Sequence, residues 1–340
     1  MHRVEIWDTL DSGWNREEWN ELCAEDPLAT VFQSSEWLQA YKETAYFKSR
    51  WIVLRRDRQP TCGVAIVRSH FTLGFAGGSF ADVRGPVMHP GAEQDLELLY
   101  EWLISSRIAP VDFREVAAER GPKGAVTLPE SVRWQIDLPT TFEEYLSTLG
   151  KSLRADLKRA ARTDGLVVEK LIGPDRLEGF EQLIRLHQAR WRQRWMPGSF
   201  HGRALKFHRR FLQSATEAQV SIWRALDAES QKPVGYLYAL HHGDTTSYYQ
   251  AGIDPQLTKC SPGTALVAAV IKDAISRGDK KFDLLRGEEP YKLRWKPQRR
   301  VENQRYLFEG DGWINQGSLA MRRKLALWER GVKSILEQRR

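Results

Sequence analysis

Residues 259–287 have the sequence KCSPGTALVAAVIKDAISRGDKKFDLLRG. Its apolar residues recur with the period of one helical face, which predicts a helix that begins at Ser261 or Pro262 and is buried along one side. A polar residue followed by proline suits a helix start, and Gly278 suits the position after the last turn. We expect strands at 246–254 and 280–287, which predicts a strand–helix–strand unit. The apolar face consists of Leu266, Val267, Val270, Ile271, Ala274 and Ile275.

The first turn of this helix has the properties of an anion site. Its backbone N–H groups have no partner inside the helix, and the positive end of the helix dipole lies there. Gly263 and Ala265 are small and leave room for a ligand to approach the backbone. The alternative interpretation is an ordinary capped helix of the core, and both interpretations are open at this point.

Length and composition indicate an ordinary globular protein with room for two domains. The chain has 340 residues, of which 41% are hydrophobic and 28% charged. No run of about 18 apolar residues occurs and the N-terminus lacks a signal-peptide pattern, so we expect a soluble, cytoplasmic protein. Cys23, Cys62 and Cys260 fit no disulfide framework and no zinc motif. The net charge of +7 favours acidic ligands.

The order of expected elements is that of an α+β protein, and it occurs twice. Each half reads as a strand, helices, a strand meander, a helix and a closing strand. We therefore predict an N-terminal domain over 1–145, a C-terminal domain over 146–310 and a basic amphipathic helix over 311–340. The basic helix is either a solvated capping helix or a contact for a membrane or RNA. The glycine run at 74–91 predicts a loop, in which Gly77 and Gly78 either line an acceptor site or only shape the turn.

Several motifs together resemble a known family. The helix start is similar to the pyrophosphate-binding turn of GNAT-superfamily N-acyltransferases, although Cys260 stands where those proteins have Gln or Arg. The order of motifs over residues about 30 to 300 resembles the CelD/BcsL-type acetyltransferase-like family, which is related to the Fem-type peptidyltransferases. The resemblance implies two tandem GNAT-like domains and an acyl-CoA donor held by Lys259, Cys260, Ser261, Gly263, Thr264 and Ala265. The motifs are VFQSSEWLQAY, GKSLRADLKRAARTDGL, LHQARW, GYLYALHHGDTTSYYQAGID, SPGTAL and FDLLRGEEPYKLRWKP.

The last motif carries the expected catalytic residues. The resemblance implies that Tyr291 and Lys292 lie near the acyl-transfer centre, where a fixed donor would stabilise the tetrahedral oxyanion. The alternative is a surface lysine beside a packing tyrosine. Asp283 lies in an apolar strand, where a carboxylate is seldom buried unless it is paired or working. It is either a general base with a raised pKa or a structural partner of Arg286 or Lys292.

Other polar residues are expected to contact substrate. His187, Arg190 and Trp191 share one helical face, which suits an acceptor or pantetheine wall or else domain packing. Arg154 belongs to a basic stripe with Lys158 and Arg162, which either binds phosphates or is simply solvated. His241 and His242 have no third ligand at metal spacing, so no metal is expected. The expected substrate contacts are Arg286, His187, Arg190, Trp191, Arg154 and Tyr249.

These observations predict an acyltransferase that moves an acyl group from acetyl-CoA or another acyl-CoA to an amine or hydroxyl. The expected acceptor is a small molecule or a glycan precursor of exopolysaccharide or cell-envelope synthesis. One alternative is a Fem-like peptidyltransferase that uses aminoacyl-tRNA, although nucleic acid is not the favoured partner. Another is a non-catalytic GNAT-like scaffold. No transmembrane segment is expected, and a peripheral membrane contact stays open.

Overall fold

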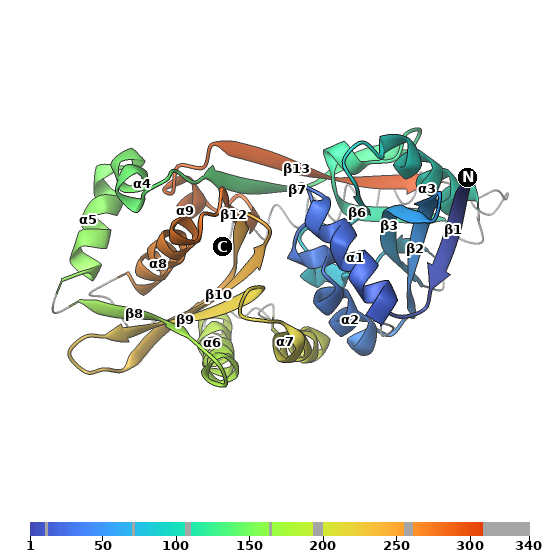
Figure 1. Cartoon of the computed structure of the whole chain (residues 1–340). Coiled ribbons are helices and arrows are strands. Elements are labelled where there is room, and N and C mark those ends of the chain that lie inside the picture. Colours follow the sequence, from blue (N-terminus) through green and yellow to red (C-terminus); the bar gives the residue numbers. More distant parts are fainter. Residues whose placement is uncertain are drawn as a thin grey trace. The chain divides into compact units, whose positions relative to one another are not determined.

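The computed structural model describes residues 1–10, 13–69, 72–105, 110–162, 165–192, 200–254 and 261–308, without the side chains of 13 and 190–192. The chain forms two compact units (Figure 1). Unit 1 contains residues 1–133 together with 286–289 and the chain from 301 onward, and unit 2 contains residues 134–285 and 290–300. This division falls between Arg133 and Trp134, and two later segments return to unit 1. The domain boundaries at 145 and 310 stay a prediction.

Unit 1 is built on a mixed β-sheet. Neighbouring strands are antiparallel until β4, which pairs with β6 in parallel, and β13 then continues the sheet antiparallel to β6. A short strand, β5, pairs with β3. The strands in sheet order are β1 (His2–Trp7), β2 (Ser49–Arg56), β3 (Gln59–Arg68), β4 (Leu73–Phe75), β6 (Val111–Ala117), β13 (Arg299–Phe308) and β7 (Val126–Asp137), with β5 at Val87–Met88.

In the described part of unit 1, three α-helices each bury one apolar side. In α3, buried Leu96, Leu99, Tyr100 and Leu103 follow the i, i+3, i+4, i+7 spacing of one helical face. They join the core with β-strand residues such as Phe113, whose ring stacks on that of Phe75 at 4.0 Å. The helices are α1 (Gly13–Glu25), α2 (Ser35–Thr44) and α3 (Glu93–Ser105), with 3-10 turns η1 (Val31–Gln33), η2 (Gly78–Phe80) and η3 (Ala118–Arg120).

Unit 2 has the same strand order and directions. Its strands are antiparallel neighbours until β11, which pairs with β12 in parallel, and β12 adjoins β7. In each unit two helices follow the first strand, and one helix connects the parallel pair. The elements are α4 (Phe142–Thr148), α5 (Lys151–Ala160), β8 (Leu166–Leu171), α6 (Asp175–Arg192), α7 (Gly202–Ser214), β9 (Val220–Asp227), β10 (Pro233–His242), β11 (Thr245–Ile253), α8 (Pro262–Arg277), β12 (Lys281–Arg286) and α9 (Pro290–Leu293).

Helices cover both faces of the unit 2 sheet. Alternate residues of β10 point to opposite faces, so Leu237 and Ala239 pack in the core with α8, whereas the ring of Tyr238 meets that of Phe180 on α6. Figure 1 shows α8 on one side of β10 and α6 with α7 on the other. The predicted start, buried face and end of α8 are confirmed. Gly278 has φ +84, and its N–H bonds to the carbonyls of Ala274 and Ile275.

The α+β fold predicted from the sequence is confirmed, with two corrections to its elements. The sequence predicted no strand at Arg299–Phe308, where β13 forms, and it predicted only loop across the glycine run, where β4 and β5 form. Cys23 and Cys62 are buried free thiols. The predicted helix over 311–340 lies outside the described residues. Among the helices that the structure describes, none is both long enough and apolar enough to cross a bilayer.

Candidate functional site

The parallel strands of unit 2 separate after three residues. The ladder joins Thr245–Ser247 to Lys281–Asp283 and then stops, although β11 continues to Ile253 and β12 to Arg286. On its other edge β11 stays paired with β10, where the register passes from Ala239↔Tyr248 to Tyr238↔Gln250. Tyr249 is the extra residue of that bulge. From Tyr248 onward, the backbone N–H and C=O groups on the edge of β11 that faces β12 therefore take no part in the β11–β12 ladder.

The N-terminus of α8 follows the separated end of β11. Ser261 is the N-cap residue, is exposed, and makes no side-chain cap bond. Pro262 occupies the first turn, and the first intrahelical bond runs from the N–H of Ala265 to the carbonyl of Ser261 at 3.0 Å. The N–H groups of Gly263 and Thr264 precede that bond and have no intrahelical acceptor. Of the expected donor-binding residues, Lys259 and Cys260 lie outside the described part of the chain.

Asp283 and Lys292 both bind Leu285. The Asp283 carboxylate accepts the N–H of Leu285 at 2.7 Å and the side-chain amide of Gln135 at 2.9 Å. The Lys292 ammonium donates to the carbonyl oxygen of Leu285 at 3.1 Å. Asp283 and Lys292 are each 2% exposed, and Leu285 has φ +56, a left-handed conformation that non-glycine residues rarely adopt. The two charged groups fix a strained residue at the end of β12.

Tyr291 lies on α9, one residue before Lys292. It is 39% exposed, and its ring lies 6.5 Å from that of Tyr248, at the point where β11 leaves the ladder. The pair is thus arranged with the lysine buried and the tyrosine accessible. A buried lysine at the separated strands and an exposed tyrosine beside it place a cation and a hydroxyl at one end of unit 2.

Arg286 belongs to unit 1. Its guanidinium pairs with Asp82 at 2.9 Å and Glu115 at 3.0 Å, and it donates to the Ser79 carbonyl at 2.6 Å. Its backbone N–H also donates to Asp82. These contacts give Arg286 a firm structural role in unit 1.

Two other expected substrate contacts, His187 and Tyr249, lie on the face of the unit 2 sheet that α6 and α7 cover, joined through the rings of Phe200 and His208. His187 on α6 is 3% exposed and packs edge-on against Phe200. The Tyr249 hydroxyl lies 3.1 Å from His208 Nε2, on the α6–α7 face of the sheet. The side chains of Arg190 and Trp191 are outside the described set.

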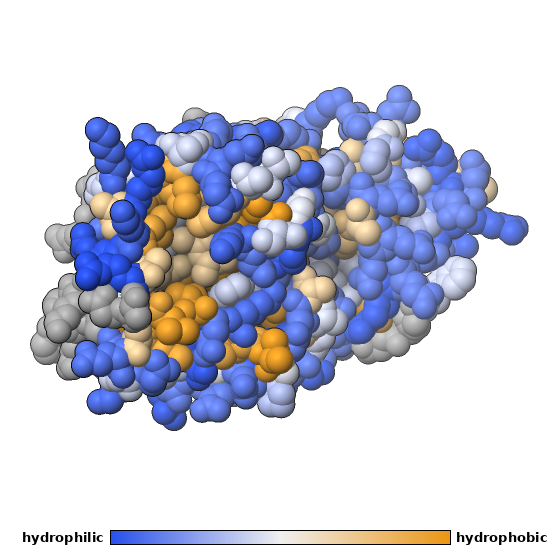
Figure 2. Space-filling view, turned by 60° about the vertical axis from the view of Figure 1, so that its left-hand side comes forward, coloured by the Kyte–Doolittle hydropathy of each residue, from blue (hydrophilic) through white to orange (hydrophobic). Residues whose placement is uncertain are grey.

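Arg154 is exposed on α5. The predicted basic stripe is shorter than expected, because α5 ends at Ala160 and Arg162 lies beyond it. Figure 2 shows apolar side chains gathered among hydrophilic ones on the side of unit 2 that this view brings forward. Large apolar side chains of unit 2 that remain exposed are Val167, Ile172, Leu177, Tyr291 and Leu293.

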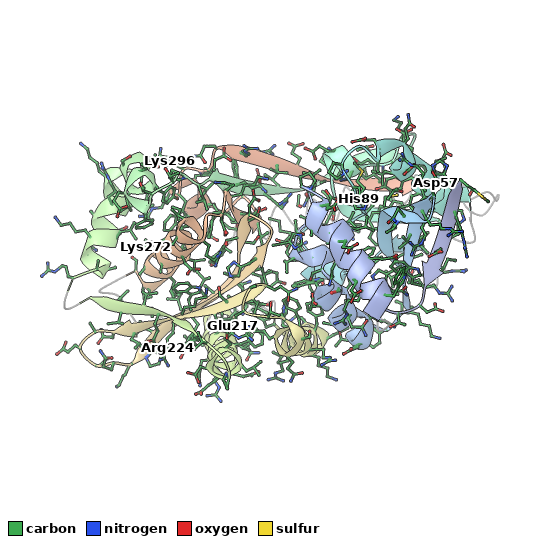
Figure 3. The ribbon with its side chains drawn as sticks, in the orientation of Figure 1. Asp57, His89, Glu217, Arg224, Lys272 and Lys296 are labelled. Carbon is green, nitrogen blue, oxygen red and sulfur yellow. The ribbon has the colours of Figure 1, made fainter. Side chains whose placement is uncertain are left out.

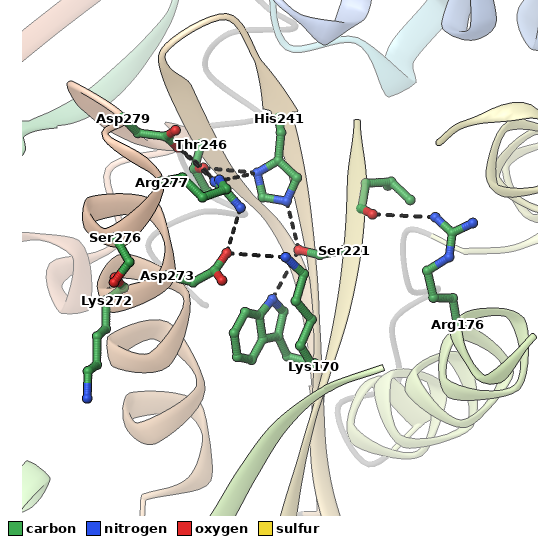
Figure 4. Close-up of polar contacts among 12 residues, drawn as sticks. Lys170, Arg176, Ser221, His241, Thr246, Lys272, Asp273, Ser276, Arg277 and Asp279 are labelled. Atoms are coloured by element: carbon green, nitrogen blue, oxygen red, sulfur yellow. Dashed lines mark hydrogen bonds and ion pairs between the residues drawn. The ribbon is translucent and has the colours of Figure 1, made fainter. Parts of the chain in front are cut away.

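A buried polar network lies at the opposite end of α8 (Figure 4). His241 Nε2 is 2.8 Å from the Ser221 hydroxyl, and His241 Nδ1 is 2.9 Å from the Thr246 hydroxyl. Thr246 donates to Asp279, which also pairs with Arg277 at 2.8 Å. Burial, and then the charge of Arg277, lowers the pKa of His241 to about 3. Because Ser221 is fully buried, this Ser–His pair is placed for structure and not for nucleophilic attack.

Sequence reasoning treated His241 only as a metal candidate and missed its network. Ser221 and Thr246 reach it from neighbouring strands, and no local spacing signals that. Across the described residues, no group of three His, Cys, Asp or Glu side chains could hold a metal ion.

Part of the chain is similar to a known domain family. Residues 149–293 match the family model described as Acetyltransferase (GNAT) domain. That range contains the separated strands, α8, Asp283 and Lys292. No curated protein sequence is significantly similar to the chain.

Most of the chain also has the fold of solved structures. FemX has a TM-score of 0.65 and 11% identity over 86% of this chain and 95% of its own. A conserved protein of unknown function from Bacteroides thetaiotaomicron has a TM-score of 0.62 and 13% identity over 90% and 100%. L-PGS from Bacillus licheniformis has a TM-score of 0.58 and 14% identity over 89% and 93%. These structures share the fold of the chain, two tandem GNAT-like domains, and most of the matched range lies in unit 2.

Proposed function

We propose that the chain is an acyltransferase that binds acyl-CoA in unit 2 and transfers the acyl group to an amine or hydroxyl. The observation that supports this most is the separation of β11 from β12 after Ser247 and Asp283. An extended amide-containing arm, such as pantetheine, can add to a free strand edge by backbone hydrogen bonds. The helix that follows this edge would receive the pyrophosphate on its first N–H groups.

A comparison of the two units supports unit 2 as the donor-binding unit. The equivalent helix of unit 1, α3, has Glu93 and Asp95 in its first turn, which would repel an anion. The first turn of α8 contains no acidic residue, and it has small residues at Gly263 and Ala265. The duplicated fold therefore offers two helix starts of opposite preference, and α8 is the one that suits a diphosphate.

The chemistry proposed for unit 2 uses residues at the end of β12 and on α9. The acceptor attacks the thioester carbonyl, the oxyanion collapses, the C–S bond breaks, and CoA leaves as the thiol after taking a proton. Lys292 and the Tyr291 hydroxyl would supply the donors that stabilise the oxyanion. Asp283, whose two oxygens are already engaged, would position Leu285, or would accept the acceptor's proton.

The acceptor is proposed to be an amine or hydroxyl of a small molecule or glycan precursor, in exopolysaccharide or cell-envelope synthesis, and the donor to be acetyl-CoA or another acyl-CoA. The alternative donor is an aminoacyl-tRNA. The exposed cations of α5, Lys151, Arg154, Lys158 and Arg159, favour a polyanionic ligand of this kind. A non-catalytic scaffold is the third alternative, and it predicts no turnover with any donor.

The first experiment is calorimetric titration of the full chain with acetyl-CoA, repeated on Gly263→Glu. A side chain fits at Gly263, because a Cβ there would meet Ile253 at an ordinary 3.7 Å. The matched control is Gly150→Glu, where the position is open and the charge change is the same. Binding that is lost in Gly263→Glu and kept in Gly150→Glu supports the donor site. No binding to the unaltered chain would contradict it, and titration with charged tRNA would follow.

A further inference from the structure

The glycine-rich loop of unit 1, Gly77–Gly85, is held in place by hydrogen bonds from several elements. The Gln33 side-chain amide donates to the Val83 carbonyl at 3.2 Å, and the Asn303 amide donates to the Asp82 carbonyl at 2.7 Å. The Arg84 N–H donates to the Glu115 carbonyl at 2.7 Å. The loop is therefore anchored to η1, β6 and β13 of the same unit.

Two glycines fix the shape of this loop. Gly77 has φ +107 and Gly78 has φ +59, and both conformations are strained for other residues. A Cβ at Gly77 would lie 2.9 Å from the Cβ of Ala81, and one at Gly78 would lie 2.8 Å from the ring of Tyr41. At these two glycines the loop backbone consequently packs closer to Ala81 and Tyr41 than any side chain would allow. This packing fixes the conformation of the loop.

Arg84 is the cation that this loop presents. It is partly buried, and its Nε is fully buried without a hydrogen-bond partner. Within the part of the chain that the structure describes, its guanidinium makes no ion pair and no side-chain hydrogen bond. Burial lowers the pKa of Arg84, and the nearby charges of Arg286 and Arg114 add to this effect, while Glu115 opposes it. The site is positively charged, and part of it is open to solvent.

The charged neighbours of Arg84 are already paired. Glu115 is 1% exposed and binds Arg286 at 3.0 Å, with further hydrogen bonds from Ser131 and from Asn303 at 3.2 Å. Asp82 also binds Arg286. Arg114 pairs with Glu130 at 2.7 Å. Asp82 and Glu115 thus share Arg286, and Glu130 pairs with Arg114, whereas among the described residues Arg84 has no acidic partner within ion-pair distance.

A partly buried guanidinium without a partner costs free energy, and a bound anion would remove that cost. We propose that Arg84 is a binding site in unit 1 for the oxyanion of a small ligand, a phosphate ester or a carboxylate. The planar guanidinium recognises both groups through paired N–H donors. The site stands on unit 1 alone, so it is independent of the acyl-CoA site proposed in unit 2.

The test is a thermal titration of the full chain with sodium phosphate and, in a second arm, sodium acetate, with chloride keeping the ionic strength constant. Above Kd, the Tm should rise by roughly 3 °C for each tenfold increase in the free anion concentration. Arg84→Gln should abolish the rise. Arg114→Gln, which removes the same charge from a paired arginine, should keep it. A response to phosphate alone, acetate alone or both supports the site and identifies its ligand group.

Two results would overturn the proposal. One is the absence of any rise with either anion up to tens of millimolar, or a rise that Arg84→Gln retains. The other comes from Arg84→Met in anion-free buffer, which should have the same Tm as the parent chain or a higher one, because an unpartnered charge is replaced by an apolar chain of similar length. A Tm lower by several degrees, or a failure to fold, would mean that the guanidinium already serves the fold.

Discussion

Asp283 and Lys292 are linked through one residue: the carboxylate accepts the N–H of Leu285, and the ammonium donates to its carbonyl. Both polar groups of a left-handed residue are thus held by buried charges. A left-handed non-glycine residue costs about 1–2 kcal/mol, and it persists where its surroundings fix it. The backbone geometry of Leu285, which follows the point where β11 and β12 separate, therefore depends on Asp283 and Lys292. Both are residues that the sequence analysis expected to be catalytic.

Asp283→Ala should destabilise unit 2, because it leaves the Leu285 N–H and the Gln135 amide without their acceptor. An unsatisfied buried polar group costs about 1–3 kcal/mol, so the free energy of unfolding should fall by that amount or more. Asp283→Asn keeps one carbonyl oxygen as acceptor and should lose less. Urea unfolding measures the free energy of unfolding of both variants, and unchanged m-values would show that the change lies in stability alone. Equal losses for alanine and asparagine would show that the hydrogen bonds do not determine the effect.

Lys292→Met tests whether Lys292 acts in the proposed acyl transfer without contributing to the binding of acetyl-CoA. The change removes the ammonium and keeps the length of the side chain. Loss of one oxyanion donor costs about 100- to 1,000-fold in kcat, whereas the Kd for acetyl-CoA should stay within about threefold. Initial rates and calorimetry measure the two quantities, with Lys296→Met as the control at an exposed lysine nearby. Unchanged turnover in Lys292→Met would exclude Lys292 as an oxyanion donor.

The main parts of the fold could be predicted because they carry periodic apolar patterns. The α8 face and its terminal Gly278 are local signals, and the repeated order of elements predicted two similar halves. β13 could not be predicted in the same way, because it buries Asn303 and Arg305 where the pattern expects apolar residues. Those polar residues are buried because they bind the Asp82 carbonyl and Asp112, which lie far away in sequence.

The site was less predictable for a related reason. Strand alternation would place Asp283 and Leu285 on the same face of β12, but Leu285 is left-handed and breaks the period of two. The alternative reading of a surface lysine beside a packing tyrosine has the exposures reversed: Lys292 is buried and Tyr291 is exposed. The separation of β11 from β12 depends on pairing between strands, which no single segment encodes. Arg84 was missed because an absent partner is visible only in three dimensions.

Lys296→Gly should stabilise the protein. Lys296 is exposed and has φ +54, so a Cβ is unfavourable there and glycine removes that cost (Figure 3). We expect a gain of about 0.5–1 kcal/mol, read as a rise in Tm. The matched control is Lys272→Gly, an exposed lysine inside α8, where glycine should cost about 1 kcal/mol. A loss of stability in both variants would contradict the strain at Lys296.

The buried network around His241 should make stability depend on pH on the acid side (Figure 4). Burial lowers the pKa of His241 to about 3, so the unfolded chain binds a proton below about pH 6.5 that the folded chain refuses. The contribution of this histidine to the free energy of unfolding should therefore be constant above about pH 6.5. Between about pH 6.5 and pH 3 it should fall by about 1.4 kcal/mol per pH unit. His208, whose pKa burial also lowers to about 3, adds a second such slope.

His241→Gln isolates the contribution of His241 to that slope. Glutamine can still donate and accept hydrogen bonds toward Ser221 and Thr246, but it binds no proton. The free energy of unfolding of this variant should therefore lack the pH dependence that His241 contributes. Comparison at pH 8 gives the packing cost of the substitution alone. At pH 5 the stability gap between the parent chain and His241→Gln should be smaller than at pH 8 by about 2 kcal/mol. Urea midpoints at pH 8, 6 and 5 measure this gap, and a constant gap would show that His241 is protonated equally in both states.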